Sequence, residues 1–168
     1  MVRECYENYP LAMVILTNIH SILIYILGAI ILYGLGTAFS VLYLLFCLFM
    51  EIRLLKNSCV NCYYHGKTCA FGKGRLSSLL FKKGDHDLFY QENITRYAVL
   101  PDFLVLLFPL TGGIILIISS FNWITFLLII SILILSLAGN AFIRSLTCRY
   151  CRQRELGCST FELFSGNE

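Results

Sequence analysis

Two long stretches of the chain carry no charged side chain, and they constrain the fold more than any other feature. They cover residues 8–50 and 103–143, and each holds about twice the roughly 20 apolar residues that one helix needs to cross a bilayer. Only 14% of all residues are charged and the mean hydropathy is +0.75, whereas soluble domains carry about 25% charged residues. The sequence therefore predicts an all-α integral membrane protein with four transmembrane helices in contact with the lipid bilayer.

Turn residues divide each uncharged stretch into a helical hairpin. Glycines within residues 33–37 supply the flexible backbone of one tight turn, and residues 119–122 form the other. In the central connection, Arg75–Lys83 has the spacing of an amphipathic helix on the inner membrane surface, and Asp85 is expected to cap a further short helix that leads to Pro101. The predicted spans are Leu11–Leu32, Ala38–Leu55, Ala98–Ile118 and Trp123–Ser145.

The basic residues orient this topology. All thirteen lie on one side of it: Arg3, eight from Arg53 to Arg96, and Arg144, Arg149, Arg152 and Arg154. By the positive-inside rule that side is the cytoplasm, so both termini are expected there, in the plasma membrane of a prokaryote. The opposite turns are uncharged, so we expect any charged partner to bind from inside. The candidate partners are a cytoplasmic protein and a second copy of the chain in a homo-oligomer. No nucleic acid is expected.

Six of the eight cysteines form two groups with the same spacing, Cys-x2-Cys-x6-Cys. Every member of the second group lies 89 residues after its counterpart in the first. Matching intervals predict an internal duplication: a first repeat at residues 1–69, a cytoplasmic amphipathic connection at 70–97, and a second repeat at 98–168. The repeats are parallel, which places their pseudo-two-fold axis along the membrane normal and brings both cysteine knuckles together. The groups are Cys59, Cys62 and Cys69, and Cys148, Cys151 and Cys158.

Thiols in the reducing cytoplasm favour metal ligation or redox chemistry over structural disulfides. Two Cys-x2-Cys turns supply the four thiolates of a tetrahedral zinc site. The simplest site therefore consists of Cys59, Cys62, Cys148 and Cys151 around one Zn²⁺. Over these four residues the chain resembles the paired knuckles of zinc ribbons and rubredoxins.

Other ligand sets remain open. Cys69 and Cys158 are left over by the shared zinc site and are candidates for a redox-active pair. Alternatively, all six thiolates hold an iron–sulfur cluster or two smaller sites. A self-contained site of Cys59, Cys62, His65 and Cys69 is a third version, but the second group has Arg154 where the first has His65.

Three polar residues of the first hairpin are expected inside the membrane. His20 and Cys47 each lie about ten residues into a predicted span, near the bilayer midplane, and Glu51 lies one turn nearer the cytoplasm. Intramembrane ionisable residues are candidates for a functional site. Interhelical hydrogen bonds that hold the bundle together are the favoured alternative.

Neither a glycine-rich phosphate loop nor a Ser/His/Asp arrangement is present, so hydrolytic chemistry is unsupported and redox activity stays open. The first hypothesis is a small membrane protein whose cysteine knuckles bind a metal as a structural clasp, metal handler or docking site. The second is a membrane electron-transfer protein with an iron–sulfur centre or a reactive Cys69/Cys158 pair. The third is a solute or ion transporter, which would need to act as an oligomer because four helices leave little room for a pathway.

Overall fold

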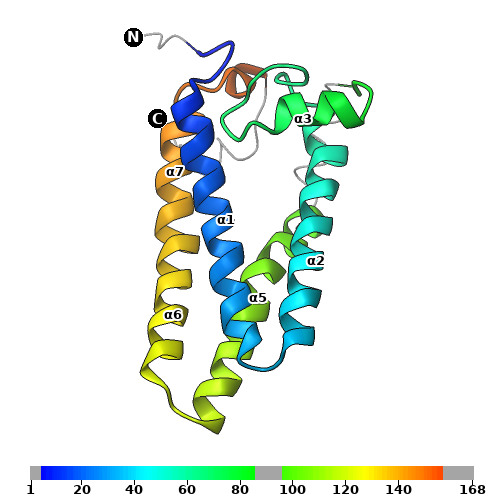
Figure 1. Ribbon diagram of the computed structural model, residues 1–168. Coiled ribbons are helices and arrows are strands. Elements are labelled where there is room, and N and C mark those ends of the chain that lie inside the picture. The colour runs from blue at the N-terminus through cyan, green and yellow to red at the C-terminus, as the bar shows by residue number, and fades with distance from the viewer. Residues whose placement is uncertain (1–4, 86–95, 157–168) are drawn as a thin grey trace. The chain divides into compact units, whose positions relative to one another are not determined.

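The structure, a computed structural model, describes residues 5–85 and 96–156, and in that part every regular element is a helix (Figure 1). A single parallel bridge joins Tyr6 to Cys151. The long helices are α1 (Leu11–Tyr33), α2 (Thr37–Leu54), α5 (Arg96–Ser119) and α6 (Trp123–Ile134). Two long helices are extended by shorter elements: α2 continues into the π-helix η1 (Leu55–Cys59), and α6 continues into the π-helix η2 (Leu135–Gly139) and then α7 (Asn140–Cys148). The remaining elements are α3 (Lys73–Leu80) and the 3₁₀-helix η3 (Arg152–Leu156).

Three helical stretches are long and apolar enough to cross a membrane: Leu11–Tyr33, Thr37–Cys59 and Trp123–Cys148. A fourth apolar stretch, Phe103–Ser119, is shorter. Much of their apolar surface is exposed, as at Leu42, which is 64% exposed. Apolar surface of this extent marks a site of membrane contact, so these helices indicate a membrane protein. Whether α5 forms a fourth span stays a prediction.

The hairpin turns lie where the sequence predicts them. Gly36 adopts a φ of +144°, a conformation that favours glycine, and the turn closes with the Gly34 N–H donating to the Ile31 carbonyl at 3.1 Å. At the second turn the Asn122 side chain accepts the Ile124 N–H at 2.9 Å as an N-cap. A helix is present near the predicted amphipathic segment Arg75–Lys83. It is α3, which begins at Lys73 and ends at Leu80, with Phe81 in an extended conformation. Its place on the membrane surface stays a prediction. The predicted helix after Asp85 falls on residues 86–95, outside the described part of the chain.

The chain divides into two compact units, each built from segments of both predicted repeats. The helix unit consists of Ile19–Glu51 and Val99–Ala141. In its core Ile24 and Ile31 of α1 pack against Ile129 and Ile132 of α6, and a second cluster joins Ala29 and Leu32 to Tyr43 and Cys47 of α2. The knuckle unit consists of Met1–Asn18, Ile52–Ala98 and Phe142–Glu168, and it contains the described knuckle cysteines.

Candidate metal centre

The two Cys-x2-Cys elements form turns with the same hydrogen bonds. Cys59 ends η1, and Cys148 ends α7. In the first turn the Cys62 N–H donates to the Cys59 carbonyl at 3.4 Å, and in the second the Cys151 N–H donates to the Cys148 carbonyl at 3.3 Å. The next bond also matches, because residues 65 and 154 donate to the carbonyls of Cys62 and Cys151 at 3.0 and 3.2 Å. Each knuckle thus starts at a helix end and turns its second cysteine back toward that end.

Reciprocal hydrogen bonds hold the two turns against each other. The Tyr63 N–H donates to Oε1 of Gln153 at 2.8 Å, and the Arg152 N–H donates to the Tyr64 hydroxyl at 3.0 Å. Residues 152 and 153 lie 89 positions after residues 63 and 64, which is the offset of the cysteines. Residue 63 contacts residue 153, and the residues at the matching positions, 152 and 64, contact each other in the same way. Such reciprocal contacts are typical of a two-fold interface. The two turns therefore meet through residues that occupy the same positions relative to their cysteines.

The thiols gather around a buried aromatic core in the knuckle unit. Tyr9, Tyr64 and Ala70 form this core, and Cys62, Cys69 and Cys151 pack against it. The rings of Tyr9 and Tyr64 lie 5.6 Å apart between centroids. Burial raises the pKa of the Cys62 thiol to about 12, although the Tyr64 N–H, which bonds to its sulfur, opposes this shift. The metal-free Cys62 is therefore a neutral thiol, which is a poor nucleophile.

Two of the sulfurs already accept backbone N–H groups, as sulfur ligands in metal centres do. The Tyr64 N–H bonds to Cys62, and the Gly74 N–H donates to Sγ of Cys69 at 3.3 Å. Gly74 itself lies against the carbonyls of Tyr64 and Lys67, where a β-carbon would clash. The Cys69 loop is thus closed so tightly that only glycine fits at its end.

The other predicted ligands have different surroundings. His65 faces Ser77, with Nδ1 and Oγ 3.5 Å apart, and the Ser77 hydroxyl also donates to the Leu55 carbonyl at 3.3 Å. Cys158 lies outside the described residues, so its predicted pairing with Cys69 is untested. The seven cysteines that the structure describes form no disulfide with one another.

As they stand, no three His, Cys, Asp or Glu side chains in residues 5–85 and 103–156 are arranged to hold a metal ion. The donor types nevertheless suit a thiophilic cation such as zinc, because four cysteines lie at the ends of two facing turns. In the first knuckle, the sulfurs of Cys62 and Cys69 also receive backbone N–H bonds. The shared four-cysteine site and the zinc stay predictions.

The first knuckle is fastened to the start of α1. The Tyr9 N–H donates to the Thr68 carbonyl at 2.9 Å, and Oγ1 of Thr17 donates to the Ala70 carbonyl at 2.7 Å. The Tyr9 hydroxyl reaches the second knuckle as well, donating to the Thr147 carbonyl at the end of α7 at 2.7 Å. One cluster of side chains therefore connects the ends of α1, α2 and α7.

The predicted intramembrane residues fall into two groups within the helix unit. Cys47 is buried and hydrogen-bonded to Tyr43, and Glu51 accepts the Tyr25 hydroxyl at 2.6 Å. His20 instead lies against Gly139, at the end of the η2 π-helix. Its imidazole is hydrogen-bonded to Asn140, while its Nε2 is buried with no partner among the described residues. His20 and Cys47 thus contact different helices.

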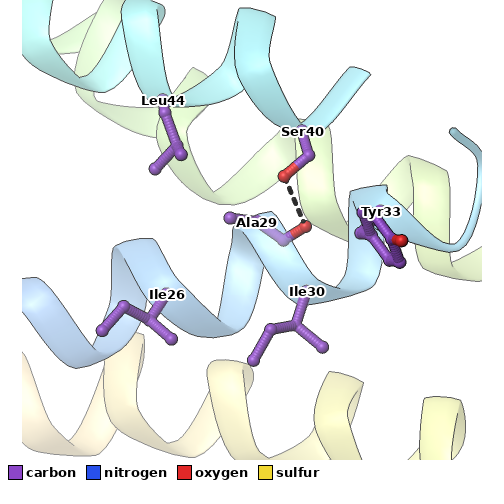
Figure 2. A pocket seen from close by; sticks show the side chains of 6 residues that line it. All are labelled: Ile26, Ala29, Ile30, Tyr33, Ser40 and Leu44. Atoms are coloured by element: carbon purple, nitrogen blue, oxygen red, sulfur yellow. Dashed lines mark hydrogen bonds between the residues drawn. The ribbon is translucent and has the colours of Figure 1, made fainter. Parts of the chain in front are cut away.

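The helix unit also has a shallow apolar hollow of about 260 Å³ between α1 and α2. Figure 2 shows its lining, in which the Ser40 hydroxyl donates to the Ala29 carbonyl at 3.0 Å. The lining is therefore mainly apolar, with the bonded Ser40 hydroxyl and the Tyr33 phenol as its polar groups. It is lined by Ile26, Ala29, Ile30, Tyr33, Ser40 and Leu44.

Sequence reasoning missed the two residues that hold the knuckles together, Tyr64 and Gln153. Each is only 2% exposed. They occupy equivalent places, two positions after Cys62 and Cys151, so the 89-residue offset was a signal for them. Their chemical difference, a phenol against an amide, hides the equivalence in the sequence.

Comparison of the chain with protein families, with curated proteins and with solved structures found no match.

Proposed function

We propose that this chain is a small integral membrane protein whose two cytoplasmic knuckles share one zinc ion, bound by Cys59, Cys62, Cys148 and Cys151. The reciprocal hydrogen bonds between residues 63 and 153 and between 152 and 64 carry this proposal. Equivalent turns that meet through equivalent residues bring their cysteines toward a common axis, and four thiolates from two such turns make a tetrahedral zinc shell.

In this proposal the metal acts as a clasp on the membrane helices. The knuckles end α2 and α7, and Tyr9 ties them to the start of α1. Helices in a bilayer associate only through packing and weak polar contacts. A metal ion that joins their ends therefore contributes its binding energy to folding.

The clasp requires both hairpins to cross the membrane from the same side, so the proposal includes α5 as the fourth span. At about 1.5 Å per residue its 24 residues reach about 36 Å, more than the roughly 30 Å of a hydrocarbon core. The tyrosine contacts add support, because Tyr6, near the start of the described chain, donates its N–H to the Tyr150 carbonyl near the end at 3.0 Å. This contact supports the prediction that both ends lie on one side, which the basic residues assign to the cytoplasm.

Metal analysis of protein purified without oxygen tests the proposal. We expect one zinc per chain in the wild type and in a Cys47→Ser control, since Cys47 is buried in the helix unit among Ala29, Leu32 and Tyr43. We expect the Cys62→Ser variant to lose the zinc. A metal-free wild type, or a Cys62→Ser variant with full metal content, would contradict the proposal.

The same analysis separates the redox alternative, because four tetrahedral thiolates also suit iron. The N–H groups bonded to Cys62 and Cys69 are of the kind that tunes iron–sulfur potentials. Iron in place of zinc, with visible absorption that bleaches on reduction by dithionite, would assign the site to electron transfer.

A further inference from the structure

Helix α3 has one face packed on the protein and one face that is exposed and apolar. Gly74 and Ser77 are buried, whereas Leu76, Leu79 and Leu80 are 47%, 81% and 58% exposed. These three leucines, the leucine face, have the i, i+3, i+4 spacing that places side chains on one side of a helix. An exposed apolar face of this kind marks a surface that contacts a membrane or another protein.

The buried face of α3 is fastened to the end of an apolar helix. The Ser77 hydroxyl donates to the Leu55 carbonyl at 3.3 Å, and after the helix the Gly84 N–H donates to the Val60 carbonyl at 3.2 Å. Leu55 belongs to the last part of Thr37–Cys59, a stretch long and apolar enough to cross a membrane. These bonds hold α3 at the end of a candidate span, which is the level at which interfacial helices lie.

The sequence around the leucine face carries only positive charge. Between Glu51 and Asp85 it has seven basic residues and no acidic one. Three of the seven lie next to the leucines in the sequence and are exposed, namely Arg75, Lys82 and Lys83. A basic segment beside a transmembrane helix attracts anionic lipids, and long basic side chains bury their stems in apolar surroundings while their charges stay in the headgroup region.

These observations favour lipid over a protein as the occupant of the leucine face. A protein partner would need an apolar surface with acidic residues around it, whereas the bilayer beside the span supplies acyl chains and anionic headgroups together. We propose that α3 and the basic residues next to it form a binding surface for anionic phospholipids, with the leucine face among the acyl chains and the three basic side chains at the lipid phosphates. This surface involves no metal ion and acts independently of the proposed clasp.

Quenching by brominated lipid tests whether the leucine face enters the bilayer. In full-length protein in phosphatidylcholine vesicles, Leu79→Trp places a fluorophore on this face, and Trp123→Phe removes the one tryptophan of the chain. Leu79 is 81% exposed, so the larger side chain has room. Bromine on the acyl chains quenches only a fluorophore that reaches them. We expect strong quenching and a blue-shifted emission.

Replacing brominated phosphatidylcholine by brominated phosphatidylglycerol at equal content measures the preference for anionic lipid. Phosphatidylglycerol should quench more, and Arg75→Gln should lower this preference about fivefold, the contribution of one basic residue near an anionic surface. Lys67→Gln is the matched control, because it removes the same charge from the same segment but its Nζ is bonded to the Tyr63 hydroxyl at 2.9 Å. We expect it to change the preference less than twofold. Salt at about 1 M, where the Debye length is about 3 Å, should remove most of the preference.

Each other outcome would overturn the proposal. An unquenched tryptophan at position 79 would show that water, a protein partner or a second copy covers the leucine face instead of lipid. Equal quenching by the two lipids would exclude anionic headgroups as the ligand. An unchanged preference in Arg75→Gln, or an equal loss in Lys67→Gln, would show that the charge of the whole chain determines the preference and that α3 has no special part in it.

Discussion

Tyr64→Phe measures how strongly the two knuckles are held together before any metal binds. The substitution removes the hydroxyl but keeps the ring, which packs on Tyr9 and Tyr63 at centroid distances of 5.6 and 5.2 Å. Two hydrogen bonds are lost, one to the Tyr6 carbonyl and one from the Arg152 N–H. At about 0.5–1.5 kcal/mol net for each bond, the loss should destabilise the closed knuckles by about 1–3 kcal/mol.

The rate at which an impermeant maleimide modifies Cys62 in the metal-free protein reports this free energy. Cys62 is partly buried against the Tyr9, Tyr64 and Ala70 core, so we expect opening of the knuckles to speed its modification. Since about 1.4 kcal/mol corresponds to a factor of ten, we expect the rate to rise about 5- to 150-fold in Tyr64→Phe. Peptide mass spectrometry separates Cys62 from the other cysteines.

Tyr63→Phe is the matched control. Its hydroxyl accepts a bond from Nζ of Lys67 at 2.9 Å, a contact between side chains within the first knuckle. We expect Cys62 modification to change less than threefold in this variant. If Cys62 reacted as fast in the wild type as in unfolded protein, or equally fast in wild type and Tyr64→Phe, the reciprocal bonds would not hold the knuckles together.

Two further predictions concern the loop and the topology. Gly74→Ala should open the first knuckle and lower the metal content, because the new β-carbon would clash with the Tyr64 and Lys67 carbonyls. Lys73→Ala, at the neighbouring position, is the control. Normal metal content in Gly74→Ala would refute the close packing. A cysteine introduced at Ser120, between α5 and α6, should react with an impermeant reagent applied to intact cells, and reaction only after permeabilisation would invert the proposed topology.

The sequence predicts the helices well because their signals are local. Uncharged apolar stretches determine where α1 and α2 lie, while Gly36 and Asn122 define the turns. The π-helical segments η1 and η2 were not predicted. Such segments depend on packing between helices, as where His20 lies against Gly139 at the end of η2. The pattern of apolar residues in the sequence does not predict this packing.

The candidate site could be predicted only in outline. The spacing of Cys59 and Cys62 identifies a knuckle, and its repetition after Cys148 predicts that two knuckles meet. The contacts that bring them together could not be predicted, because Gln153 and Tyr64 are of different chemical type and reach across 88 to 90 residues. Pairings over such separations depend on the tertiary fold.

A double-mutant cycle on Cys62 and Cys151 tests the central claim, that the two knuckles share one ion. Each single change to serine should release the metal and lower the melting temperature by a similar amount. The double variant should be little less stable than either one, because the site is already lost. Additive losses, with half of the metal retained in each single variant, would contradict the shared site and establish two independent ones.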